Sequence, residues 1–219
     1  KRLADKETKA MLIRELESAD SSVLHAYSWT WISSKANRHY EGMSFTDVAA
    51  ERGTSIEQMI CEVMYEEKFS CGLRGVPPSS ARLWRAVEED VMSLLDRPDY
   101  MVGSDAIPVG GVQHPRAWGT FPRIMGRLRR RHNYPVEQLV QRLAQNPARR
   151  FGLAERGEIK EGFRADICIF DPEMINDLSS FEDPMMHPIG IPHVLVNGQL
   201  VVEDSECTGI MSGEGIKAI

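Results

Sequence analysis

Apolar and polar positions alternate with a helical period over several stretches of the chain. Residues 3–17 form an amphipathic pattern. Ser44 and Ser55 each begin a capping motif with a polar residue three positions later, and Gly53 can end the first of these two helices. A further helix is predicted from about 80 to 95. Its expected buried stripe consists of Leu83, Val87, Val91 and Leu94.

Two segments before residue 152 have the composition of strands. In residues 23–34 the side chains of Trp29 and Trp31 are expected to share one face at period two. A shorter apolar run, residues 100–105, ends at Asp105. Glycine, proline and serine predict loops at 69–80 and 106–123. The next helix is expected to start at Pro135 and to end at Asn146 and Pro147.

The order of helix, strand, helices, strand and helix is typical of a (β/α)₈ barrel. Past residue 152 the pattern changes to short β-type runs, at 158–160, 165–170 and 193–202, separated by glycines. Asn197-Gly198 suits the two-residue turn of a β-hairpin. The chain is therefore expected to be α/β: residues 1–152 as the C-terminal part of a TIM-type barrel, and residues 153–219 as strands of a small β-sandwich.

A closed barrel of this type needs eight parallel strands and typically about 250 residues. Only two such strands are predicted here, and an isolated pair would leave unpaired edges. We therefore expect the chain to be a piece of a larger protein, whose N-terminal half completes the barrel.

The composition of the chain limits the kinds of molecule that it is expected to bind and the compartment in which it is expected to lie. The net charge of −6 argues against non-specific nucleic-acid binding, and the basic cluster at 126–132 is expected to be a solvated helix end. No apolar stretch is long enough to span a membrane, and the N-terminus lacks a signal-peptide pattern. The four cysteines form no CxxC pair, which favours free thiols in a reducing cytoplasm.

Asp105 and three basic residues after it are the candidates for chemistry. Catalytic side chains of βα barrels lie at the C-terminal ends of strands, where Asp105 is predicted, although an aspartate there can also cap a turn. Arg116 could bind a substrate carboxylate through both guanidinium nitrogens, or form a structural ion pair. His114 could contact substrate or shuttle a proton, or bond within the loop. Arg123 completes the basic set.

Several motifs resemble one family. GSD (103–105), HPR (114–116) and GTFPR (119–123) are similar to the N-acyl-D-amino-acid deacylases (D-aminoacylases) of the amidohydrolase superfamily. The resemblance continues through NPARRFGL, RGEIKEGFRADICIFDP, GIPHVLVNG and the final TG at 208–209. The chain resembles roughly the C-terminal half of such an enzyme.

The resemblance implies a metallohydrolase barrel with zinc at the C-terminal ends of its strands, and a β-sandwich built from both chain ends. Asp105 would take a proton from zinc-bound water and later pass it to the departing amine. Arg116 would bind the carboxylate of the amino acid, with His114 and Ser34 as further substrate contacts.

The zinc ligands of the family are an HxH pair, further histidines and a cysteine. No HxH occurs here, and the six histidines lack ligand spacing, so no metal ligand is assigned in this chain. The predicted ligands lie in the missing N-terminal half, and this chain alone is expected to be inactive.

The sequence thus predicts the C-terminal portion of a zinc-dependent hydrolase that cleaves the amide bond of N-acyl-D-amino acids. Two alternatives stay open at this stage. One is a non-catalytic chain that docks onto a separately encoded N-terminal half. The other is a cyclic-amide hydrolase of the same superfamily (dihydroorotase-like), which would not need the carboxylate partner Arg116.

Overall fold

The computed structural model describes residues 2–18, 21–75, 80–107, 109 and 112–216. The chain forms two compact units, which are described separately below. The first unit comprises residues 1–79 with 107–114, and the second comprises residues 80–106 with 115–219. The predicted division at residue 152 concerns the completed barrel and sandwich, and it stays a prediction.

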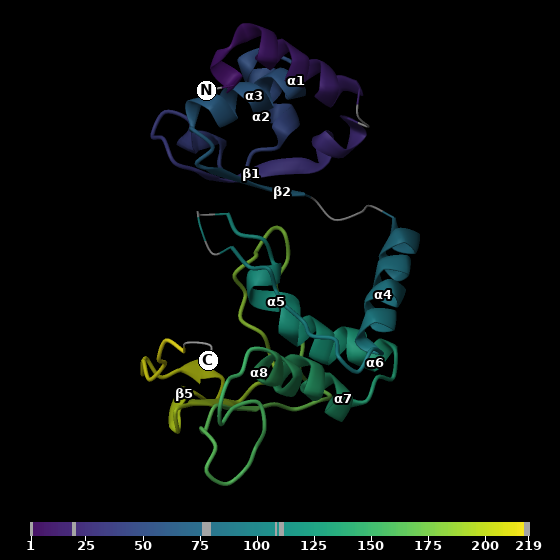
Figure 1. Ribbon diagram of the computed structural model, residues 1–219, viewed down its shortest axis with the longest axis vertical. Coiled ribbons are helices and arrows are strands. Elements are labelled where there is room, and N and C mark those ends of the chain that lie inside the picture. Colours follow the sequence, from purple (N-terminus) through teal and green to yellow (C-terminus); the bar gives the residue numbers. More distant parts are fainter. Residues whose placement is uncertain (1, 19–20, 76–79, 108, 110–111, 217–219) are drawn as a thin grey trace. The chain divides into compact units, whose positions relative to one another are not determined.

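The first unit places helices on a two-stranded sheet (Figure 1). Its elements are 3-10 turns at Arg2–Ala4, Ser21–Ala26 and Arg38–Tyr40, helices α1 (Lys6–Ser18), α2 (Phe45–Arg52) and α3 (Ile56–Glu66), and strands β1 (Tyr27–Ile32) and β2 (Cys71–Gly75). The three predicted helices are confirmed. The hydroxyls of Ser44 and Ser55 accept the N–H groups of Asp47 and Gln58, and Gly53 ends α2 in the left-handed conformation.

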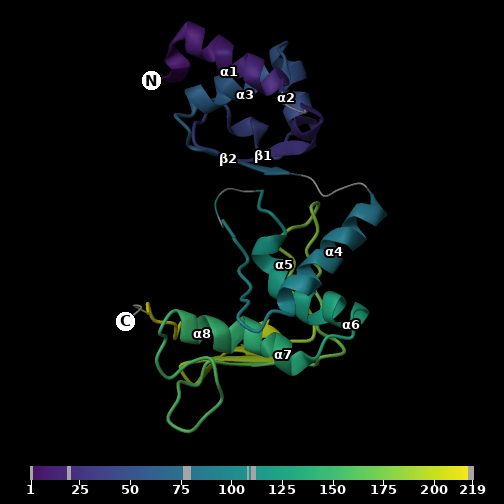
Figure 2. The same ribbon diagram turned by 45° about the vertical axis from the view of Figure 1, so that its right-hand side comes forward.

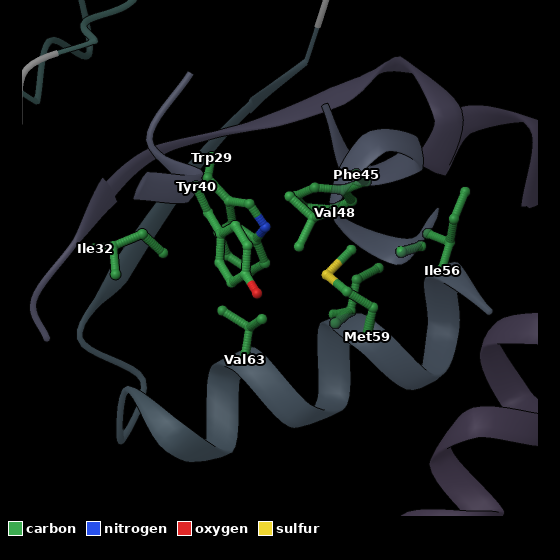
Figure 3. Packing of buried hydrophobic residues seen from close by; sticks show 10 residues of the cluster. Trp29, Ile32, Tyr40, Phe45, Val48, Ile56, Met59 and Val63 are labelled. Atoms are coloured by element: carbon green, nitrogen blue, oxygen red, sulfur yellow. The ribbon is translucent and has the colours of Figure 1, made fainter. Parts of the chain in front are cut away.

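The core of this unit forms where α2 and α3 turn their apolar faces toward β1 (Figure 3). Trp29 is fully buried and its ring lies 4.7 Å from that of Phe45, centre to centre. Met59 and Val63, four positions apart on α3, are also fully buried. Helical spacing in the sequence therefore predicts which face of α3 is buried.

The strands of this unit correct two expectations. Residues 69–80 were expected to be a loop, but β2 pairs antiparallel with β1, so β1 is not a parallel barrel strand in the described structure. A register shift between Trp29 and Trp31 interrupts the alternation, as a β-bulge does. Trp29 and Ile32 are therefore the buried side chains, whereas Trp31 is half-buried and does not share the environment of Trp29.

The second unit contains the remaining helices and a four-stranded antiparallel sheet in the order β3-β4-β5-β6 (Figure 2). The helical elements are α4 (Ala81–Leu95), α5 (Arg116–Arg123), a π turn (Ile124–Leu128), α6 (Arg129–Arg131), α7 (Val136–Val140), a second π turn (Gln141–Gln145) and α8 (Asn146–Arg150). The strands are β3 (Ile167–Ile169), β4 (His193–Val196), β5 (Gln199–Glu203) and β6 (Glu206–Cys207).

Helix α4 has the predicted bounds but buries a different face. Its buried residues are Glu88, Met92 and Leu95. Met92 and Leu95 belong to the second core cluster, whose other buried members are Ile124, Met125, Leu128, Tyr134, Leu139 and Ile175. The predicted stripe is not buried: Leu83, Val87 and Leu94 are exposed, and Val91 is half-buried. Leu83, Val87 and Leu94 are therefore incompletely covered by the described residues, whereas Val91 packs against the second core cluster.

Residues 106–123 are not loop throughout, because a helix begins at Arg116 and continues through α5, the first π turn and α6. Pro122 lies inside this helix and is followed by the π turn, a common accommodation of a missing N–H group. The backbone of Ile175 approaches the helix closely at Gly126. A glycine is required there because a Cβ would overlap the carbonyl group of Ile175.

The predicted helix end at Asn146 and Pro147 is also wrong, since α7, the second π turn and α8 run on to Arg150. Pro147 lies in the first turn of α8, where its missing N–H group is tolerated beside the π turn. Local proline signals thus mark irregular turns here, not helix ends.

The cluster at 126–132 lies at a helix end, as predicted, but is only partly solvated: Arg127 and Arg131 are exposed, whereas Arg129 and Arg130 are half-buried. Arg129 and Arg130 donate hydrogen bonds to the carbonyl of Pro172, and Arg130 also donates to the carbonyl of Ile175 at 2.9 Å. Arg131 forms an ion pair with Glu88 of α4. These arginines therefore tie one helix to a segment more than forty residues away and to α4.

The hairpin of β4 and β5 is confirmed, with positive φ at both Asn197 and Gly198 as a type I′ turn requires. Residues 158–160, predicted as a β-type run, form no strand. None of the residues in β3–β6 is buried. The described part of the chain therefore leaves both faces of this sheet incompletely covered.

Candidate functional site

Asp105 lies in an extended segment that is not a strand. Residues 100–107 carry no strand assignment, which corrects the prediction of a strand ending at Asp105. A strand needs a hydrogen-bonded neighbour, and none of the described residues supplies one here. Asp105 itself has φ of +49°, and its side chain is 82% exposed. The hydroxyl of Ser104 accepts the N–H of Ala106 at 3.3 Å and so braces this turn.

Arg116 is the first residue of α5, directly after Pro115 at the N-cap. Its Nη2 lies 3.1 Å from Oδ2 of Asp105. The structure therefore brings together the acid and the guanidinium that are eleven positions apart in the sequence. Both groups belong to the second unit, and the ion pair is open to solvent on the carboxylate side.

The other two predicted site residues lie in the first unit. His114 is half-buried at the end of the 107–114 segment. Ser34 follows β1, and its hydroxyl and its backbone N–H both donate to the carboxylate of Glu67, at 2.6 and 2.8 Å. Sequence reasoning did not identify Glu67, because its partners lie more than thirty positions away.

Glu67 is a buried carboxylate at the C-terminal end of α3, only 2% exposed. Burial raises its pKa, but donors from Ser34, Asn37 and Ser33 outweigh burial and hold the pKa at about 2. The Asn37 amide also donates to Glu66, which pairs with Arg52. This network fixes the loop that carries Ser34 onto α3.

The network makes the first unit sensitive to acid. Because the pKa of Glu67 falls from an ordinary 4.5 to about 2 on folding, its contribution is complete above pH 4.5. That contribution, of order 3 kcal/mol, is lost as the pH falls from 4.5 toward 2. Urea unfolding of the wild type and of Glu67→Gln, measured between pH 7 and pH 3, checks this. The Gln variant should lose less stability over this range, and parallel curves would contradict the assignment.

Arg123, also a candidate from the sequence, has a structural partner. Its Nε and Nη2 donate to Oδ2 of Asp177 at 2.9 and 2.6 Å, and the Asp177 side chain is 4% exposed. Gly119, one turn earlier, leaves room for Asp177 and Ser179 against α5. The sequence carries no local signal for this pair, since its members are 54 positions apart.

The described residues contain no group of three or more His, Cys, Asp or Glu side chains able to hold a metal ion. The residues present therefore do not fit a catalytic zinc site. All four cysteines are free, in agreement with the absence of a CxxC pair. No described helix has the length and apolar character that crossing a membrane requires.

Comparison with known proteins finds amidohydrolases and deacylases among the relatives of this chain. The profile of the Amidohydrolase family matches residues 74–202. D-aminoacylase of Alcaligenes xylosoxydans xylosoxydans is 36% identical over 173 residues, which cover 78% of this chain and 33% of that protein. N-acyl-D-glutamate deacylase of the same organism is 34% identical over 158 residues, which cover 72% of this chain and 30% of that protein.

Solved structures show the same relationship. A crystal structure of D-aminoacylase matches with a TM-score of 0.72 and 32% identity, over 94% of this chain and 44% of that chain. N-acyl-D-glutamate deacylase from Bordetella bronchiseptica, complexed with zinc and a phosphonate inhibitor, matches with a TM-score of 0.69 and 30% identity, over 87% of this chain and 36% of that chain. The chain spans about a third of the length of the curated relatives.

Proposed function

Since the chain belongs to the amidohydrolase family and is D-aminoacylase-like, we propose that it is the C-terminal portion of a hydrolase for N-acyl-D-amino acids. In this proposal residues 1–152 contribute to a (β/α)₈ barrel and residues 153–219 to a β-sandwich. We call the assembly of this chain with a metal-bearing barrel segment the complete enzyme. The observation that carries the proposal is the 3.1 Å pairing of Asp105 with Arg116.

Asp105 is the residue for proton transfer. Its side chain is 82% exposed, so a water molecule or an amide nitrogen can reach it. As a carboxylate it takes a proton from the water that attacks the scissile carbonyl. It then returns that proton to the amine, which leaves as the carbon–nitrogen bond breaks. The backbone at Asp105 is left-handed, a conformation that non-glycine residues seldom adopt and that is found more often at functional sites.

Arg116 is the residue for the substrate carboxylate. Its position at the first turn of α5 places the guanidinium on a helix anchored by Arg123 to the buried Asp177. A guanidinium matches a carboxylate with two parallel hydrogen bonds. The carboxylate of Asp105 lies 3.1 Å from this guanidinium, which supports an anion-binding role for Arg116. Substrate binding would exchange this partner for the substrate carboxylate and release Asp105 for proton transfer.

His114 and Ser34 are proposed as further substrate contacts. Ser34 is fixed in place by Glu67, whose burial and hydrogen bonds hold the loop after β1. In this role the backbone N–H and the hydroxyl of Ser34 would donate hydrogen bonds both to Glu67 and to the substrate. His114 lies two positions before Arg116 in the sequence and can act as a neutral donor or acceptor.

The remaining barrel is proposed to supply the zinc ligands and to cover two surfaces. The exposed stripe of α4, which includes Leu83, Val87 and Leu94, is one of them. The other is the β3–β6 sheet, whose strands have no buried residue. Apolar side chains on a helix stripe and on a sheet are stabilised by burial against a further layer. The free cysteines fit a cytoplasmic enzyme.

Arg116→Ala tests the proposal. The variant of the complete enzyme is expected to raise the KM for an N-acetyl-D-amino acid by about 10- to 100-fold, because a charge-assisted hydrogen-bond pair is lost. The same substitution should leave the KM for the matching N-acetyl-D-amino-acid amide unchanged, since that substrate keeps the scissile N-acetyl bond but has no carboxylate. Steady-state kinetics with both substrates measures the difference. An equal effect on both substrates would contradict the role of Arg116.

A further inference from the structure

An open cavity of about 620 Å³ lies at the surface of the second unit, between α4 and the end of the helix that includes α6. The two elements lie side by side in both views (Figures 1 and 2). Neither Asp105 nor Arg116 lines this cavity. The charged, imidazole and aromatic side chains that matter for its chemistry are Trp84, Arg85, Glu88, Arg127, Arg131 and His132.

The walls of the cavity carry unpaired positive charge. Arg131 is paired with Glu88, whereas Arg85 and Arg127 make no ion pair with any residue that the structure describes. Glu89, exposed on α4, is the second carboxylate of the lining. Three guanidinium groups thus face two carboxylates, in a chain whose overall net charge is −6.

His132 and Trp84 also line the cavity. The Nε2 atom of His132 is buried and has no hydrogen-bond partner among the described residues, which is an unfavourable state for a polar atom. The indole of Trp84 is 36% exposed at the same cavity. The accessible lining therefore combines guanidinium forks with an aromatic face.

We propose that this cavity binds an organic oxyanion, namely a phosphate or carboxylate group carried on an aromatic ring. Arg85 and Arg127 supply bidentate donors for the anionic group, a geometry that lysine would not provide. Trp84 supplies a surface on which the ligand's ring can stack. The volume lies within the range of small-molecule sites, about 300–1,000 Å³, and exceeds what a bare anion needs.

Isothermal titration calorimetry of the chain tests this proposal with four probes at constant ionic strength: phenyl phosphate, benzoate, inorganic phosphate and phenol. At least one aromatic anion is expected to bind with one-to-one stoichiometry and about fivefold or more tighter than inorganic phosphate, because of ring stacking. Phenol, which lacks the charge, should bind weakly or not at all. The tighter of phenyl phosphate and benzoate identifies the head group, and either result supports the proposal.

Variants locate the binding. Arg127→Gln is expected to weaken binding of the aromatic anion about tenfold, and Arg85→Gln provides a second, independent variant. Arg82→Gln is the matched control, because Arg82 is exposed on the same helix as Arg85 and does not line the cavity. Its binding constant should equal that of the wild type. Absence of binding by both aromatic anions, or an equal loss in Arg82→Gln, would overturn the proposal.

Discussion

Asp105→Asn is expected to lower the kcat of the complete enzyme by about 10²- to 10⁴-fold, the usual contribution of a group that transfers a proton in the transition state. Asparagine has nearly the same shape as aspartate but can neither accept the proton of the attacking water nor return it to the amine. Because the substrate carboxylate is assigned to Arg116 and not to Asp105, the KM should change far less than kcat. Steady-state hydrolysis of an N-acetyl-D-amino acid measures both quantities.

Asp99→Asn is the matched control for this prediction. Asp99 lies six positions before Asp105, its side chain is 72% exposed, and it pairs with its neighbour Arg97 at 3.3 Å. An exposed ion pair of this kind contributes little, so the control should keep the wild-type kcat. The role of Asp105 would be contradicted if both variants retained full activity with bound metal.

Arg123→Ala is expected to lower the free energy of unfolding of the second unit by about 3–5 kcal/mol. The Asp177 side chain is 4% exposed, and two of the hydrogen bonds from Arg123 end on the same carboxylate oxygen. Removing the guanidinium leaves a buried carboxylate with its charge uncompensated, which costs more than the pair contributes when intact. Urea unfolding followed by circular dichroism at pH 7 measures the change.

Arg149→Ala is the control for the stability experiment. Arg149 pairs with Glu158 at 2.9 Å, but its side chain is 64% exposed, so its loss should cost less than about 1 kcal/mol. A double variant, Arg123→Met with Asp177→Leu, should recover much of the loss, because no buried charge is then left unpaired. If Arg123→Ala behaved like Arg149→Ala, the pair with Asp177 would not anchor α5.

Three local signals, two helix caps and one hairpin turn, were read correctly from the sequence. The capping serines Ser44 and Ser55 mark the starts of α2 and α3, and Asn197-Gly198 marks the hairpin turn. In each case the side chain or backbone that decides the structure bonds within three or four positions.

Features that depend on distant residues were not predictable in this way. The 69–80 segment contains a strand because β1 pairs with it, and the buried face of α4 is set by contacts with the second core cluster. The 106–123 region looks like loop from its glycines and prolines, yet α5 is helical, and Gly119 and Gly126 allow the 175–179 segment to approach. Close backbone packing, not flexibility, accounts for these glycines.

The residues of the candidate site also divide into those that the sequence identifies and those that depend on distant partners. Asp105 and Arg116 were both identified from the sequence, and the structure brings them within 3.1 Å of each other. Asp177 and Glu67 were not identified, because an isolated carboxylate in a sequence gives no sign that it will be buried among donors. Those two buried carboxylates hold the segments that carry Arg116 and Ser34.

The most direct test is a crystal structure of the complete enzyme with zinc and a phosphonate mimic of the tetrahedral intermediate. The account predicts that a carboxylate oxygen of Asp105 lies within about 2.6–3.2 Å of a phosphonate oxygen. It also predicts that Arg116 donates to the carboxylate of the inhibitor in place of Asp105. An Asp105 side chain that stays paired with Arg116, with the inhibitor carboxylate held by other residues, would contradict it.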